Sequence, residues 1–232
     1  MVETRKKILV TGGSKGIGLG IARIFYHRDF EVIICARGEG DLKKAAATMP
    51  GLHTYVCDLS KKEAVKQLAA EINQKHGVLD VLVNNAGTFQ MGEMHAEEDE
   101  VFELLMATNV SSAYYLTKAL LPGMIERKQG TIFNVCSIAS LMPYTSGSSY
   151  SISKYALLGF SKVLREEMKA HDIRVVALMP GAVYTDSWAA SGLPPERFIA
   201  VEDIAKLVWN AYDLSDATVV EDIVVRPRLG DI

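Results

Sequence analysis

Short apolar runs alternate with longer amphipathic stretches along the whole chain. Seven runs rich in Val and Ile are almost continuously apolar, and we predict them as strands at residues 6–11, 31–36, 53–58, 80–85, 130–137, 174–180 and 218–225. Continuous apolar runs suit strands that are covered on both faces. The pattern therefore favours a parallel sheet that lies between layers of helices.

The stretches between these runs have helical periodicity. Val65, Leu68, Ala69 and Ile72 recur at the spacing of one helix face, and similar patterns occupy residues 98–121 and 150–171. Strands that alternate with helices in this way are joined by right-handed crossovers. We therefore predict an α/β protein with a single-domain Rossmann fold over residues 1–232, in which helices cover both faces of a doubly wound, parallel, seven-stranded sheet.

Composition narrows the class of protein. Apolar residues make up 49% of the chain and charged residues 23%, which is typical of a globular protein. A net charge of −3 without a long basic run argues against a nucleic-acid partner. No apolar stretch approaches the length of a membrane span, and the N-terminus has no signal-peptide pattern. We expect a cytoplasmic protein with no membrane partner.

The cysteines and histidines give no pattern of metal ligands. Cys35, Cys57 and Cys136 each lie inside an apolar run, so we expect small buried side chains without disulfides. The five histidines, at positions 27, 53, 76, 95 and 171, share no helical or short-range ligand spacing. The sequence therefore gives no support for a metal site.

A glycine-rich turn follows the first predicted strand and precedes a helical pattern. Gly12, Gly16 and Gly18 follow the spacing T-G-x-x-x-G-x-G. Glycines at such a turn let the backbone approach a phosphate, and the helix behind them offers free N–H groups. The residues expected at a dinucleotide cofactor are Gly12, Ser14, Lys15, Gly16, Ile17 and Gly18. The alternative is a glycine-rich turn without a ligand.

The end of the second predicted strand indicates which dinucleotide is bound. Enzymes that use NAD normally carry Asp or Glu there, to bond the ribose 2′-hydroxyl. This chain has Ala36 and then Arg37, and Lys15 in the glycine loop adds a second cation. Two cations suit the 2′-phosphate of NADP, which we therefore prefer over NAD. Both cations could instead be solvated, and Glu39 and Asp41 nearby weaken the argument.

Tyr150 and Lys154 lie four residues apart in a helical pattern. In a helix the two side chains share one face, with about 5–6 Å between their Cβ atoms. A cation that close favours phenolate, so it would lower the pKa of Tyr150 from its usual value near 10 and make it a useful acid near neutrality. A buried Tyr beside a solvated Lys is the alternative interpretation.

Together with Asn84-Asn85-Ala86-Gly87, these features resemble the classical branch of the short-chain dehydrogenases/reductases. The resemblance implies catalytic roles for Asn109, Ser137, Tyr150 and Lys154. It also implies that the dinucleotide contacts, besides the glycine loop and Arg37, the residues Asp58, Leu59, Asn85, Ala86, Gly87, Tyr150, Lys154, Pro180, Gly181, Val183 and Thr185.

The resemblance further implies a mechanism in which hydride passes from the nicotinamide to a carbonyl carbon. Tyr150 would protonate the carbonyl oxygen, and Ser137 would hydrogen-bond it. Lys154 would tune Tyr150 and bind the nicotinamide ribose, and Asn109 would hold a water that links Lys154 to solvent.

The last third of the chain resembles the bacterial sepiapterin reductase-like members of the family, which reduce a side-chain ketone on a pterin. The stretch between Thr185 and Glu202 is short for a lid over the substrate. Around it, aromatic and apolar side chains could flank a small or medium carbonyl compound. The substrate residues we expect are Ser137, Tyr144, Tyr150 and Trp188, with Phe89, Met91 and Met142 as further candidates.

Other functions stay open from the sequence. A 3-oxoacyl thioester reductase would need a basic surface near its pocket, and the modest charge offers no clear one. An NADP-binding sensor would commonly lack the Tyr or the Lys. A Ser-His-Asp hydrolase is disfavoured, because the chain has no G-x-S-x-G elbow. Apolar side chains on several faces of the helices at 98–121 and 150–171 favour a homodimer or homotetramer.

Overall fold

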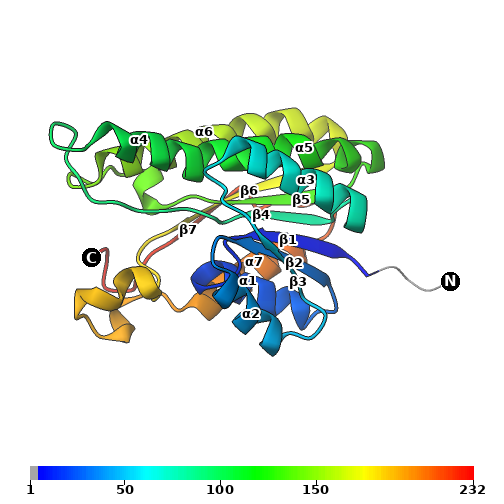
Figure 1. Ribbon diagram of the computed structural model, residues 1–232, viewed down its shortest axis with the longest axis horizontal. Coiled ribbons are helices and arrows are strands. Elements are labelled where there is room, and N and C mark those ends of the chain that lie inside the picture. Colours follow the sequence, from blue (N-terminus) through cyan, green and yellow to red (C-terminus); the bar gives the residue numbers. More distant parts are fainter. Residues whose placement is uncertain (1–4) are drawn as a thin grey trace.

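The computed structural model describes the backbone of residues 5–232 and the side chains of these residues except 187, 189 and 190. Its centre is a seven-stranded sheet in the order β3-β2-β1-β4-β5-β6-β7, with every pair of neighbours parallel (Figure 1). The strands are β1 (Lys7–Thr11), β2 (Glu31–Ala36), β3 (His53–Val56), β4 (Val81–Asn84), β5 (Gly130–Val135), β6 (Ile173–Pro180) and β7 (Asp222–Val225). The predicted doubly wound Rossmann fold is confirmed.

Two layers of helices cover the two faces of the sheet (Figure 1). The lower layer consists of α1 (Gly16–Tyr26), α2 (Glu39–Thr48) and α7 (Val201–Tyr212). The upper layer consists of α3 (Lys62–His76), α4 (Asp99–Met106), α5 (Ser112–Arg127) and α6 (Ser148–Met168). Strands in this arrangement must be apolar on both faces, which explains their nearly continuous apolar sequences.

Successive strand residues pack into separate cores. Ile8 and Val10 of β1 belong to the core beneath α1, α2 and α7, whereas Leu9 between them belongs to the core beneath α3 and α5. Side chains in a strand alternate between the two faces of the sheet, so one strand serves both cores. The three cysteines are buried and free, as expected.

Two predicted elements differ from those observed. The run at 218–225 forms a strand only from Asp222, because the amide of Thr218 donates to the carbonyl of Ser215 in a preceding turn. The helical pattern at 98–121 is α4 and α5 joined by a π-helical turn, Ala107–Ser111. π-Helical turns are rare in proteins, and those that occur often lie at functional sites.

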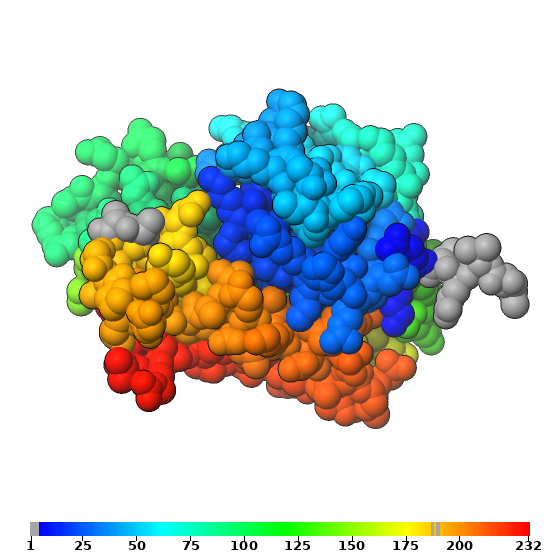
Figure 2. Space-filling view, turned by 90° about the horizontal axis from the view of Figure 1, so that it is seen from below, coloured from blue at the N-terminus to red at the C-terminus, as the bar shows by residue number. Residues whose placement is uncertain are grey.

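The carboxyl ends of the strands share one edge of the sheet. The residues after β4, the segment at 181–200 and the C-terminal residues all gather at this edge, on the left in Figure 1. Figure 2 shows the yellow-to-orange segment at 181–200 between the green residues that follow β4 and the red C-terminal residues. In open α/β sheets ligands bind beyond this edge, where the strand order reverses between β1 and β4. Among residues 5–232, no helix has the length and apolarity that a membrane crossing requires.

Candidate active site

The glycine loop is shaped to admit a ligand close to its backbone. Gly12 and Gly16 have φ angles of +63° and +51°, which side-chain-bearing residues rarely adopt. A Cβ on Gly18 would lie 2.4 Å from the carbonyl oxygen of Gly12, so only glycine fits there. The helix that begins at Gly16 has no side-chain cap on its first amides. These features fit the pyrophosphate of a dinucleotide.

The stretch Asn84–Gly87 fixes the glycine loop to β4. Thr11 Oγ1 accepts hydrogen bonds from the amides of Asn85 and Ala86, each at 2.9 Å. Asn85 Nδ2 donates to the carbonyl oxygens of Thr11 and Gly12 at 2.8 and 3.3 Å. Asn85 thus contributes both its backbone amide and its side-chain Nδ2 to the contact with the loop. The side chain of Asn85 therefore holds the loop in place.

Asn109 lies in the π-helical turn and is almost fully buried. Its Oδ1 accepts from the amide of Thr88 at 2.8 Å, and its Nδ2 donates to the carbonyl of Thr88 and to Ser153 Oγ. A Cβ on Gly87 would lie 3.3 Å from Asn109 Oδ1 and 3.5 Å from Lys154 Nζ. The missing side chain of Gly87 thus leaves a small space between the Asn109 amide and the Lys154 ammonium.

Ser137 and Tyr150 meet where β5 ends and α6 begins. Ser137 follows the strand, and its Oγ accepts a hydrogen bond from the amide of Ala139 at 3.1 Å. The ring of Tyr150 packs edge-on against Phe89, with 4.8 Å between centroids. Burial raises the pKa of Tyr150, and a hydrogen bond with Ser137 opposes this effect.

Lys154 lies one turn after Tyr150 with its charged end inside the protein. Its side chain is buried, and Nζ donates to the carbonyl of Val135 at 2.9 Å. Nζ lies 5.8 Å from the centroid of the Tyr150 ring. Burial lowers the pKa of Lys154 to about 8. The alternative of a solvated lysine is therefore wrong.

The protein's own groups raise the pKa of Tyr150, whereas the spacing to Lys154 predicts a decrease. Lys154 was expected to lower that pKa, but the causes that act on Tyr150 are burial, Ser137 and Cys136, and their net effect is upward. The reason is that Lys154 is buried and Tyr150 is half-buried, and the loss of surrounding water disfavours the charged form of each. A lower Tyr150 pKa would need further positive charge beside the phenol.

The residues predicted to bind the adenosine end of the dinucleotide differ in whether their side chains already have partners within the protein. Arg37 is exposed and has no hydrogen bond or ion pair among the residues described. Lys15 is not free, because its Nζ pairs with Asp41 at 3.0 Å and with Asp186 at 3.5 Å. Asp58 Oδ1 accepts from both the amide and the hydroxyl of Ser60. These bonds lower the pKa of Asp58, with Ser60 as the first cause.

Leu59 is buried beside Asp58 and packs in the core beneath α3 and α5. Ser14 and Ile17 are half-buried in the glycine loop, and Ile17 packs on the core beneath α1. They lie in the predicted loop, although Ile17 directs its side chain to the interior.

The segment after β6 returns to the glycine loop. The amide of Gly181 donates to the carbonyl of Val225 at 2.7 Å, and Val183 pairs with Ile199 in an isolated bridge. The methyl carbon of Thr185 lies 3.1 Å from the place that a Cβ on Gly16 would occupy. The segment that follows Pro180, the last residue of β6, thus runs from the carboxyl edge of the sheet to the predicted pyrophosphate site.

The predicted substrate residues lie around the same edge but differ in their contacts. Tyr144 is near Tyr150 and its pKa is raised, chiefly by burial. Trp188 packs on Phe198 within the segment at 181–200, with 5.6 Å between ring centroids. Phe89, Met91 and Met142 are exposed, and Met142 Sδ contacts the guanidinium of Arg226 at 3.1 Å.

Sequence reasoning missed two charged residues of the C-terminal segment. Arg226 Nη1 pairs with Asp231 Oδ2 at 3.1 Å, and both charges act on the pKa of Tyr144. Asp231 Oδ1 is buried, has no hydrogen-bond partner among the described residues, and lies 3.2 Å from the place of a Cβ on Gly181. No motif marks these residues, and only the return of the C-terminus to this edge brings them near Tyr144.

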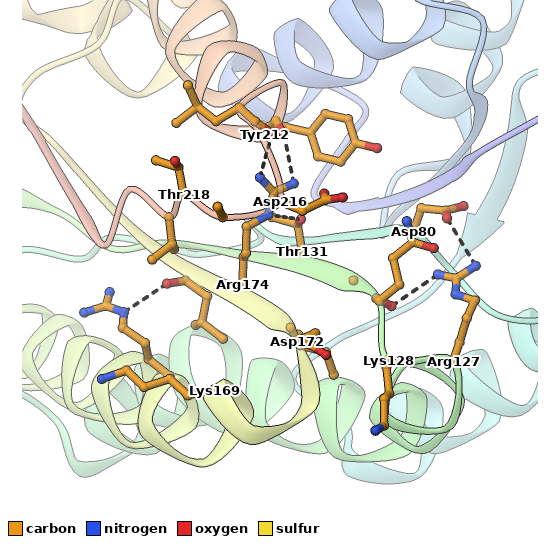
Figure 3. A pocket seen from close by; sticks show the side chains of 18 of the residues that line it. Asp80, Arg127, Lys128, Thr131, Lys169, Asp172, Arg174, Tyr212, Asp216 and Thr218 are labelled. Atoms are coloured by element: carbon orange, nitrogen blue, oxygen red, sulfur yellow. Dashed lines mark hydrogen bonds and ion pairs between the residues drawn. The ribbon is translucent and has the colours of Figure 1, made fainter.

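A separate cavity lies away from these residues. It has a volume of about 600 Å³ and is lined by residues at the amino ends of β5 and β6 and by the segment after α7 (Figure 3). Its arginines are engaged, since Arg174 donates to the carbonyl of Tyr212 and Arg127 pairs with Asp80. This cavity is at the edge opposite Tyr150, so we do not assign the chemistry to it.

A sequence model described as short chain dehydrogenase matches residues 6–194. The chain belongs to the short-chain dehydrogenase family. It is therefore an oxidoreductase of that family, and the recognition made from the glycine loop, the NNAG stretch and the Tyr–Lys pair is confirmed.

Some individual relatives of this short-chain dehydrogenase match over nearly their whole length. It is 33% identical to sepiapterin reductase from Chlorobaculum tepidum, with 97% of each chain covered. It is 31% identical to a 3-oxoacyl-[acyl-carrier-protein] reductase from Chlamydia pneumoniae, with 95% of each chain covered. Among solved structures, a metagenomic short-chain oxidoreductase in complex with NADP has a TM-score of 0.83 and 30% identity, covering 96% of each chain.

Proposed function

We propose that this short-chain dehydrogenase reduces a small or medium carbonyl compound to an alcohol with NADPH. The observation that carries the proposal is the arrangement of Ser137, Tyr150 and Lys154. The Ser137 hydroxyl acts on the phenol of Tyr150, and the ring of Tyr150 lies 5.8 Å from the buried ammonium of Lys154, at the edge of the sheet that also carries the glycine loop. Such a set can donate a proton to a carbonyl oxygen while hydride is added to its carbon.

The bound nicotinamide would supply the hydride. Tyr150 would donate its proton to the substrate oxygen, and Ser137 would donate a hydrogen bond to the same oxygen as negative charge develops there. Both side chains have a fixed neighbour, since the amide of Ala139 donates to Ser137 Oγ and the Tyr150 ring packs on Phe89. Little reorganisation is therefore needed at the moment of reaction.

Lys154 and Asn109 would return a proton to Tyr150. Both Nδ2 hydrogens of Asn109 are used by Thr88 and Ser153, so a water at this amide could only donate to Oδ1. The space above Gly87 lies between Oδ1 and Lys154 Nζ, where a water could donate to one and accept from the other. We therefore place the predicted relay water beside Gly87.

Selection of NADP over NAD would depend on Arg37. Among the two predicted cations it is the one without a carboxylate partner in the described chain, whereas Lys15 already has two. The NADP complex of the metagenomic relative supports this choice. A guanidinium can bind a phosphate with two hydrogen bonds.

Arg37→Asp should reverse the cofactor preference. The substitution removes a cation from the 2′-phosphate and adds a charge that repels it, so we expect NADPH to bind at least about 100-fold more weakly, while NADH binding changes little. Titration of cofactor fluorescence measures both dissociation constants. Lys61→Asp provides a control on the other side of Asp58. An unchanged NADPH-to-NADH ratio in Arg37→Asp would contradict the assignment.

For the substrate, we propose a ketone on a compound that also offers N–H donors, such as a pterin. The similarity to the Chlorobaculum sepiapterin reductase supports this class. Asp231 supports it independently, because its Oδ1 is a buried acceptor near Tyr144 for which the described part of the chain provides no hydrogen-bond donor. An unsatisfied buried acceptor costs free energy that a ligand N–H group would recover.

A substrate panel tests this proposal directly. Purified protein would be mixed with NADPH and with simple ketones, diketones, pterins bearing a side-chain ketone, and acetoacetyl thioesters, and loss of reduced nicotinamide followed by absorbance. We expect turnover of ketones, with the lowest KM for the pterin. Preference for the thioester would support the function named for the Chlamydia relative. NADPH binding without turnover of any compound would favour a sensor and contradict the proposal.

We also propose that the protein is a homodimer or homotetramer that associates through α5 and α6. Large apolar side chains on these helices are exposed in the single chain, including Tyr114, Tyr155 and Val163. Covering such side chains with a second copy would remove them from water.

A further inference from the structure

Three metal-ligating side chains meet at the amino edge of the sheet, opposite Tyr150. Glu31 begins β2, His53 begins β3, and His76 ends α3. One ligand atom from each lies within 4.8 Å of the other two. His76 Nδ1 is 2.6 Å from Glu31 Oε1, and His53 Nε2 is 3.7 Å from the same oxygen. The histidine spacing in the sequence indicated no such group, because the three residues come from separate elements that only the fold brings together.

These distances are close to those of a tetrahedral metal site. Bonds of about 2.0–2.2 Å from Zn²⁺ to nitrogen and oxygen place neighbouring ligand atoms about 3.3 Å apart. The two separations from Glu31 Oε1 bracket this value, and the histidine nitrogens lie within 4.8 Å of each other, so small rotations of exposed His53 and of Glu31 would complete the geometry. Two imidazoles and one carboxylate form a common ligand set for Zn²⁺, with water in the fourth position.

We propose that Glu31, His53 and His76 bind a divalent transition-metal ion of the Zn²⁺ class. The ion would join β2, the edge strand β3 and the end of α3. This role lies outside the proposed carbonyl reduction and does not depend on it.

A hydrogen-bond partner is already in place to orient the buried ligand. Tyr55 OH lies 2.8 Å from His76 Nε2. With the metal on Nδ1, the ring proton would lie on Nε2 and be donated to the Tyr55 oxygen. Ligating histidines nearly always donate their second ring N–H in this way, which fixes the ring and its tautomer.

The candidate site opens to solvent on the side of His53, which is exposed. A cavity of about 310 Å³, lined in part by Glu31 and His53 and by the Pro50–Gly51 turn, gives an ion access from solvent.

The cysteines do not compete for the ion. Burial raises the pKa of Cys35 to about 12 and those of Cys57 and Cys136 to about 11. With these pKa values the three buried thiols stay protonated at neutral pH. A thiol binds metal as thiolate, so these groups are poor ligands there. Metal bound by the folded chain would therefore not be held by these thiols.

Calorimetric titration of the full, untagged chain with ZnCl₂ tests the proposal. We expect one ion per chain. His53→Ala should weaken binding by more than about 100-fold, since it removes a ligand, and Tyr55→Phe by about 10-fold, since it removes an outer partner. His53 is exposed, so its substitution should leave the fold intact, as circular dichroism would verify.

His95→Ala is the matched control. His95 Nδ1 lies 3.6 Å from Glu93 Oε2 in an exposed pair that lacks a third ligand, so this variant should bind Zn²⁺ like the wild type. Co²⁺ provides a second readout, because its visible absorption reports a four-coordinate site and should be lost in His53→Ala alone. Equal Zn²⁺ binding by wild type and His53→Ala, or no binding by the wild type, would overturn the proposal.

Discussion

Tyr150→Phe should nearly abolish carbonyl reduction while the protein still binds NADPH. The substitution removes only the hydroxyl, so the substrate oxygen loses its proton donor, and we expect kcat to fall about 10²–10⁴-fold. Phe keeps the aromatic ring that packs edge-on against Phe89, so the helix and the glycine loop should remain in place. Steady-state turnover of the best ketone and fluorescence titration with NADPH measure the two effects.

The matched control for Tyr150→Phe is Tyr155→Phe. Tyr155 lies on the same helix, α6, but is exposed. We expect this variant to keep wild-type turnover. Wild-type turnover in Tyr150→Phe would show that another group protonates the substrate. Loss of NADPH binding in Tyr150→Phe would instead contradict the expectation that the hydroxyl serves proton transfer and is not needed to bind NADPH.

Lys154→Met should lower activity about 10²–10³-fold and remove a step from the pH profile. The pKa of Lys154 is about 8, so its ammonium, which supplies the proton relay, is lost as the pH rises through that value. Wild-type kcat/KM for reduction should therefore fall above about pH 8. In Lys154→Met this fall should be absent, because the group that titrates has been removed.

The same substitution should stabilise the fold near neutral pH. The pKa of Lys154 is about 8 in the folded chain and 10.5 for an ordinary lysine, so the unfolded chain binds the additional proton between these values. The ammonium therefore opposes folding at pH 7, and stability rises as the pH increases through this window. We expect Lys154→Met to raise the free energy of unfolding at pH 7 by roughly 1–3 kcal/mol, after loss of the bond to Val135.

Denaturant titrations at pH 7 and pH 10 measure this gain, which should shrink at the higher pH. Lys162→Met is the control, since Lys162 lies on the same helix but is exposed. It should change neither the pH profile nor the stability by much. A Lys154→Met variant that is less stable than the wild type at pH 7, with a pH profile that still falls near pH 8, would contradict both expectations.

The sequence by itself determined the layered fold and the main elements of the candidate site. Continuous apolar runs require strands covered on both faces, and the positions of Leu9 between Ile8 and Val10 show the expected alternation between two cores. The glycine loop was predictable for the same local reason, since a turn from strand to helix with positive φ angles at Gly12 and Gly16 needs glycine. The one-turn spacing of Tyr150 and Lys154 also follows from helix geometry alone.

Only the tertiary structure decided which charges remain available. Lys15 is held by Asp41 and Asp186, while Arg37 is left without a partner in the described chain. Burial of Lys154 sets its pKa near 8, and the pKa of Tyr150 rises instead of falling. The spacing of two residues shows that they are neighbours, but the sign of a pKa shift depends on how much water the surrounding chain excludes.

Residues far apart in the chain were likewise joined only by the fold. Asp231 reaches the surroundings of Tyr144, and Glu31, His53 and His76 come together from three different elements. Their meeting depends on strand order and register, since parallel strands align their first residues at one edge and their last residues at the other. Local periodicity encodes each strand, but no local pattern encodes which strands become neighbours.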